Sequence, residues 1–115
     1  MSEKNVNVAE TVEETTEEIA GVGTYIFKTP TKIDGETVES INYDFTTLKG
    51  ENVRNARTEL GKRGYVVSSK MLDVCYHAAM FAEAAGITYA DVERFGMKDY
   101  DEVADIAQDF LYGEG

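Results

Sequence analysis

A chain of 115 residues has the usual size of a single domain with one hydrophobic core. Its formal net charge of -11, from 22 acidic and 11 basic side chains, disfavours nucleic acids and anionic membranes as partners, because both need Lys and Arg to neutralise phosphate. The single cysteine excludes an intramolecular disulfide, and no run of about 20 apolar residues predicts a membrane-spanning helix. We therefore expect a soluble protein of a reducing cytoplasm, with a neutral or basic protein as its partner.

The first 22 residues are predicted to be an acidic disordered tail, followed by a single domain over 23–115. In the tail, glutamates alternate with Thr, Val and Ala, which leaves too little apolar surface to offset the entropy of ordering. A frayed helix with a weak apolar stripe of Val8, Val12 and Ile19 is the alternative. The segment is too polar for a secretory signal, and it is not an amphipathic transit peptide.

Two runs of β-forming residues flank the pair Asp34-Gly35. This pair is the strongest short-range signal of a β-hairpin, because the turn needs a positive φ that Gly adopts without strain. The two arms are predicted over about 24–33 and 36–45. Pro30 removes a backbone donor from the first arm, so that arm should be an edge strand or be broken there.

Two longer helices are predicted after the hairpin. The segment 49–63 spaces its apolar residues at three- and four-residue steps, which is typical of an amphipathic helix, and its outer face is basic. The second helix is expected from Ser68 or Ser69 to Ala85, and Gly86 should end it. Because this second helix is apolar around most of its circumference, it should be the central and most buried element.

Two more helices complete the predicted fold. Thr88 and Asp91 resemble a capping box, which favours a short helix over about 89–95. The last helix is expected over 99–112, with acidic side chains in its first turn that suit the helix dipole. The expected fold class is α+β and mainly α, with an N-terminal β-hairpin followed by three to four helices.

No catalytic, cofactor or metal site is predicted. Cys75 and His77 lie two residues apart on a helix, where side chains point about 160° apart, so they cannot form a thiol and base pair. We expect Cys75 in the core and His77 on the helix surface. Asp99, Asp101 and Asp105 lack the rest of a calcium loop and are interpreted as a solvated acidic helix face. The protein should therefore act by binding and not as an enzyme.

Apolar side chains on the first helix and at the end of the last helix exceed what a small core needs. Aromatic residues are favoured anchors of protein interfaces, and ordering usually decays at a chain end unless the end is tied down. The predicted partner-binding residues are Val53, Leu60, Phe110, Leu111 and Tyr112. The charge is also uneven, about +4 over 49–70 and about -8 over 71–115, which makes a head-to-tail homo-oligomer a further hypothesis.

Six short sequence motifs follow one another along the chain. They are Ile33-Asp-Gly-Glu36, Leu48-Lys-Gly-Glu51, Ala56-Arg-Thr-Glu-Leu60, Ala84-Ala-Gly-Ile87, Lys98-Asp-Tyr-Asp-Glu-Val103 and Asp109-Phe-Leu111. In order and spacing they resemble the small tail assembly chaperones of long-tailed bacteriophages, the group that includes the corresponding protein of phage Mu. None of the motifs is a catalytic signature.

The resemblance implies a protein that binds the tape measure protein and keeps it soluble for tail tube assembly. It implies a place in the cytoplasm of the bacterial host and absence from the finished virion. It also implies that a longer form, made by a ribosomal frameshift, could recruit the tail tube protein, and the ending Tyr112-Gly-Glu-Gly115 would suit the short form. The alternative function is that of an acidic inhibitor or DNA mimic, in which carboxylates over 99–109 imitate phosphates toward a basic partner.

Overall fold

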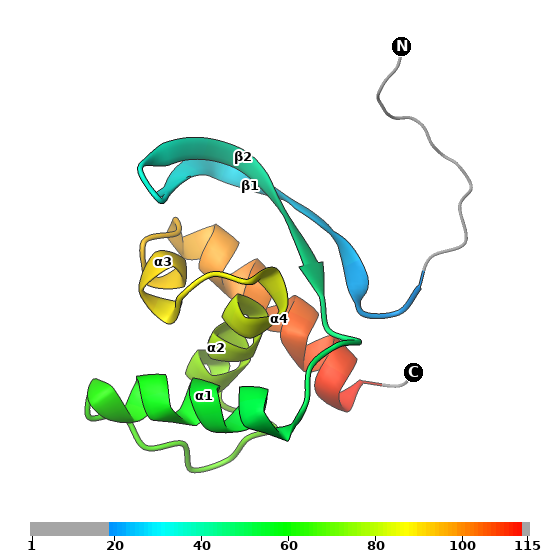
Figure 1. Ribbon diagram of the computed structural model, residues 1–115, viewed down its shortest axis with the longest axis vertical. Coiled ribbons are helices and arrows are strands. Elements are labelled where there is room, and N and C mark those ends of the chain that lie inside the picture. The colour runs from blue at the N-terminus through cyan, green and yellow to red at the C-terminus, as the bar shows by residue number, and fades with distance from the viewer. Residues whose placement is uncertain (1–18, 114–115) are drawn as a thin grey trace.

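The computed structural model describes residues 19–113, which form one antiparallel hairpin followed by four helices (Figure 1). In chain order the elements are β1 (Val22–Ile33), β2 (Glu36–Asp44), α1 (Gly50–Lys62), α2 (Val74–Ala85), α3 (Tyr89–Glu93) and α4 (Met97–Tyr112). The hairpin arches across the helices, and its base lies beside the end of α4 (Figure 1). The predicted α+β class is confirmed, whereas residues 1–18 of the predicted tail lie outside the described residues. None of the described helices is long and apolar enough to cross a membrane.

The hairpin turn is the predicted Asp34-Gly35 pair. Both residues have positive φ angles, 55° and 82°, as in the hairpin turns whose twist matches that of the two strands. The pairing of β1 with β2 is interrupted between Ile26 and Thr31, where β1 contains more residues than the facing part of β2. Pro30 lies inside this interruption, so the predicted break in the first arm is confirmed.

The interruption frees backbone amides of β1 to bind the carboxylate of Asp99 on α4. The amides of Lys28 and Thr29 donate to this carboxylate at 2.8 Å and 3.1 Å, and the hydroxyl of Tyr25 donates to it at 2.5 Å. Only 1% of Asp99 is exposed, so its predicted place on a solvated acidic face is wrong. The reason is that the interrupted strand leaves the amides of Lys28 and Thr29 free to bind Asp99 in the first turn of α4.

The core is centred on α2, as the apolar composition of this helix predicts. The other three helices and β2 all pack against α2. Seven consecutive residues of α2, Tyr76 to Ala82, are buried. Gly86 ends the helix in the left-handed conformation at φ 74°, which is the expected role of a glycine at this position.

The start of α2 differs from the prediction. The helix begins at Val74 and not after Ser68 or Ser69. Asp73 caps it, because the carboxylate of Asp73 accepts a hydrogen bond of 3.0 Å from the amide of Tyr76. The preceding residues therefore form an irregular connection from α1, and their apolar side chains do not extend the buried face of α2.

His77 is buried with 2% of its surface exposed, so the prediction of a helix-surface residue is wrong. Neighbours pack on nearly every side of α2, which leaves this helix without a solvent face at that point. The Nε2 atom of His77 lies 2.7 Å from the carbonyl oxygen of Lys70, and the His77 ring contacts the ring of Tyr112 with 5.8 Å between centroids. Cys75 was expected in the core and lies at its edge, partly buried and packed against it.

The short helix α3 begins with the predicted capping box. Thr88 Oγ1 accepts a hydrogen bond of 3.0 Å from the amide of Asp91, and the Asp91 carboxylate accepts one of 3.1 Å from the amide of Thr88. The helix ends at Glu93, slightly earlier than expected. Phe95 follows and packs its ring edge-on against Phe27 of β1, with 4.8 Å between centroids, which ties α3 to the hairpin.

Candidate partner-binding surfaces

Leu60 is a core residue of α1. Only 1% of it is exposed, because the narrow apolar stripe of α1 faces α2. Its carbonyl oxygen also accepts a hydrogen bond of 3.0 Å from the amide of Tyr65, which closes the end of the helix. The Leu60 side chain is therefore covered in this structure, and its role in binding a partner stays a prediction, as do the roles of the other four residues.

Val53 lies on the flank of α1 and is partly buried. It lines a shallow hollow of about 470 Å³ on the surface of the helix. The residues of this α1 hollow are Gly50, Val53, Arg54, Arg57 and Thr58. Since two guanidinium groups stand beside one apolar side chain, the α1 hollow suits a partner that presents an apolar group flanked by carboxylates.

Phe110, Leu111 and Tyr112 form a second surface, which we call the α4 end. Phe110 stacks on Phe45, just after β2, with 5.2 Å between ring centroids, and it remains 39% exposed. Tyr112 contacts His77 and remains 37% exposed, whereas Leu111 is partly buried against the core. The α4 end is thus fixed by contacts on one side and open to solvent on the other.

A substitution at Gly21 should show how firmly the α4 end is held. A Cβ atom at Gly21 would lie 2.5 Å from the Phe110 ring, whereas a Cβ at Gly35 would meet no atom within 4 Å. Both glycines have similar positive φ angles, 86° and 82°, so the backbone strain of an alanine is similar at the two sites. We expect Gly21→Ala to cost about 2 kcal/mol more unfolding free energy than Gly35→Ala in urea denaturation. Equal losses would show that Phe110 moves aside freely.

A third surface was not predicted as a surface, because three of its four residues, Met71, Leu72 and Val74, were assigned to the buried second helix. We call it the loop patch, and it consists of Val66, Met71, Leu72 and Val74 in and just after the connection between α1 and α2. Their exposed fractions are 82%, 55%, 72% and 47% respectively. Asp73 could have revealed this surface, because Asp is a favoured residue at the N-cap of a helix. If α2 is taken to start after Asp73, the apolar residues before it lie in a loop.

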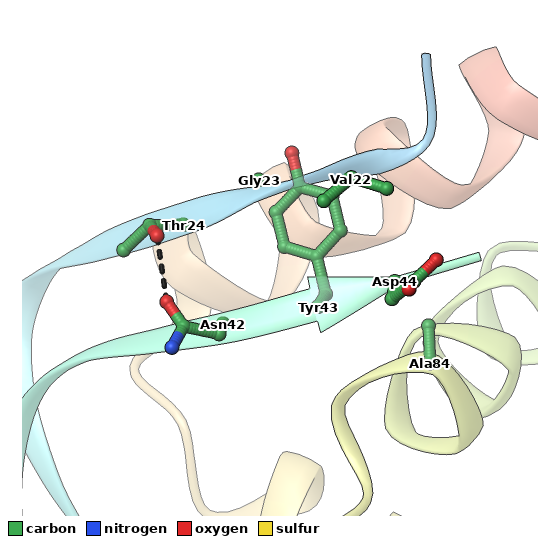
Figure 2. A pocket seen from close by; sticks show the side chains of 7 residues that line it. All are labelled: Val22, Gly23, Thr24, Asn42, Tyr43, Asp44 and Ala84. Carbon is green, nitrogen blue, oxygen red and sulfur yellow. Dashed lines mark hydrogen bonds between the residues drawn. The ribbon is translucent and has the colours of Figure 1, made fainter. Parts of the chain in front are cut away.

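A further hollow, of about 500 Å³, lies at the base of the hairpin beside α2 (Figure 2). The Tyr43 ring reaches across from β2 to Gly23 on β1, where a Cβ would lie 2.6 Å from the tyrosine oxygen. Thr24 Oγ1 donates to Asn42 Oδ1 at 2.6 Å on the neighbouring rung. These residues hold the two strands together, and they include no nucleophile placed beside a base.

The described residues also contain no group of three or more His, Cys, Asp or Glu side chains that could hold a metal ion. The imidazole of His77 is engaged by the carbonyl oxygen of Lys70. Three surfaces between residues 19 and 113 expose apolar side chains: the α1 hollow, the α4 end and the loop patch.

Comparison with known proteins agrees with surfaces of this kind. A family model described as phage tail assembly chaperone proteins, E, or 41 or 14, matches residues 24–112. No curated protein and no solved structure gives a match. The family match runs from β1 to the last residue of α4 and so covers both the hairpin and all four described helices. The chain therefore belongs to the phage tail assembly chaperone family.

Proposed function

We propose that the protein binds the tape measure protein of its phage and keeps it soluble until the tail tube assembles around it. The family supports this proposal, and one structural observation carries it: large apolar side chains of the loop patch and the α4 end are open to solvent. Exposed groups of apolar side chains mark surfaces for protein contact. The proposed client segment is an amphipathic helix that lays its apolar face on them.

Contacts of Gln108 and His77 hold the connection between α1 and α2 against the last turns of α4. Gln108 of α4 donates from Nε2 to the carbonyl oxygen of Met71 at 3.0 Å. His77 lies against both Lys70 of the connection and Tyr112 of α4. Because Gln108 and Tyr112 are neighbours on the surface of one helix, the two surfaces adjoin there. An amphipathic helix can therefore contact Met71 and Tyr112 together.

The proposed activity is binding without chemistry, in the cytoplasm of the bacterial host and before the virion is complete. The tail tube protein is a second proposed partner, reached through a longer form of the chaperone. Binding to apolar side chains should persist at moderate salt, since salt screens exposed charges but does not weaken apolar burial. An acidic inhibitor that binds through its carboxylates would instead release its partner as salt is added.

Leu72 and Ile26 offer a matched pair for the test, because each is 72% exposed but only Leu72 belongs to the loop patch. We would co-express the tape measure protein with the wild type, with Leu72→Ser or with Ile26→Ser, and measure the soluble fraction of the tape measure protein. Removing an interface anchor costs about 2 kcal/mol or more, which weakens binding roughly thirtyfold. We expect Leu72→Ser to lose soluble client and Ile26→Ser to resemble the wild type.

Thermal melting of both variants provides the folding control, since neither exposed side chain should matter for stability. A tape measure protein that stays equally soluble without any chaperone would remove the proposal. Equal loss of soluble client with both variants would show that the loop patch is not the binding surface.

A further inference from the structure

The α1 hollow is lined by residues of α1 alone. Arg54 and Arg57 are exposed, and neither forms an ion pair with any residue between 19 and 113. The surface beside the hollow is also open, because a Cβ at Gly50 or at Gly61 would meet no atom within 4 Å. Val53 is left at a shallow, positively charged site that another helix can approach closely.

A row of side chains on α4 carries the opposite charge to the α1 hollow. Met97, Asp101, Asp105 and Asp109 follow one another at four-residue steps, so they lie along one ridge of the helix. All four are exposed, and Met97 has 79% of its surface in solvent. Within residues 19–113 none of the three carboxylates forms an ion pair. We call this row the α4 ridge, an apolar side chain followed by three acids.

We propose that the α4 ridge of one copy docks onto the α1 hollow of a second copy. Met97 packs against Val53, and the acids that follow Met97 lie beside Arg54 and Arg57. Met97 and Asp101 on the ridge are four residues apart, and so are Val53 and Arg57 on α1. In both helices this step corresponds to about 6 Å of rise, so the two pairs can face each other. A ridge of this spacing is the one that fits between the ridges of another helix.

The contact joins two different surfaces, so each copy in a pair keeps one α1 hollow and one α4 ridge free. Head-to-tail contacts of this kind build rings or open arrays. The α1 hollow and the α4 ridge include no residue of the loop patch or of the α4 end. The inference goes beyond the proposed function and does not depend on it.

Charge reversal tests the contact with full-length chains. The α4-reversed variant carries Asp101→Arg and Asp105→Arg, the α1-reversed variant carries Arg54→Asp and Arg57→Asp, and the control carries Glu36→Arg and Glu39→Arg on the exposed hairpin. Sedimentation velocity over a range of protein concentrations, at one moderate ionic strength, gives the dissociation constant of self-association. We expect the wild type and the control to associate, and each reversed variant to bind itself at least tenfold more weakly.

Mixing the two reversed variants tests whether these two surfaces contact each other. A one-to-one mixture of the two reversed variants should associate again, because each brings the charge that the other lacks. A combined variant with all four reversals should also recover, and its formal net charge of -11 equals that of the wild type, so net repulsion cannot explain the recovery. A monomeric wild type, or a mixture that stays monomeric, overturns the proposal. Loss in the α1-reversed variant alone also overturns it, because a segment other than the α4 ridge would then occupy the hollow.

Discussion

Replacing Asp99 with Ala should lower the free energy of unfolding by about 3 kcal/mol, measured by urea denaturation. The substitution removes the acceptor of the Tyr25 hydroxyl and of the Lys28 and Thr29 amides, which leaves these donors without a partner at the contact between β1 and α4. Donors that lose their acceptor in a buried place cost more than the net worth of a hydrogen bond. Asp101→Ala is the control on the same helix, and it should stay within about 0.5 kcal/mol because Asp101 is exposed. Equal effects of the two substitutions would contradict the assigned role of Asp99.

The Asp99 carboxyl also predicts how stability depends on pH. Burial raises its pKa, but the hydrogen bonds from Tyr25, Lys28 and Thr29 outweigh burial and hold the pKa below the ordinary value of 3.8. A carboxyl whose pKa is lower in the folded state contributes stability above its unfolded pKa and loses it as the pH falls through its folded pKa. The difference in stability between the wild type and Asp99→Ala should therefore be constant near neutral pH and shrink below about pH 4. A difference that does not change down to pH 2 would contradict this assignment.

Leu60→Ser should cost about 4 kcal/mol of unfolding free energy, while Val53→Ser on the same helix should cost about 1 kcal/mol. Leu60 fills the space between α1 and α2, so the shorter side chain leaves a cavity and buries a hydroxyl group. Val53 is only partly buried beside a hollow that water can enter. Urea denaturation of both variants measures the difference. A stable Leu60→Ser chain that no longer binds its client would support the prediction that Leu60 binds a partner.

Local signals in the sequence were sufficient for the elements that depend on local chemistry. The Asp34-Gly35 turn and the Thr88 capping box follow from the backbone needs of a few neighbouring residues, and both are confirmed. The break at Pro30 follows in the same way, because proline has no amide to donate. The place of α2 at the centre of the core follows from an apolar composition that leaves the helix no solvent face.

The errors concern residues whose surroundings come from distant parts of the chain. Asp99 resembles its acidic neighbours in sequence, and only the amides exposed by the interrupted strand make it a buried acceptor. His77 is buried because Lys70 and Tyr112 reach it from two sides. The loop patch was missed because Met71 and Leu72 fit a helical pattern until Asp73 is recognised as the cap. In the predicted partner-binding set, Leu60 was placed on the correct stripe, but the stripe alone does not tell which member is covered by α2.

The bond between Tyr25 and Asp99 joins residues 74 positions apart in the chain, which has a consequence for synthesis on the ribosome. The hairpin leaves the ribosome before the four helices, but a two-stranded hairpin alone is only marginally stable in water. The amides of Lys28 and Thr29 have no acceptor from α4 until residue 99 has been translated and released. The hairpin therefore gains its contacts with α4 only after the last described helix has been made. A nascent chain that stalls before α4 exposes a strand pair whose edges are open to other chains.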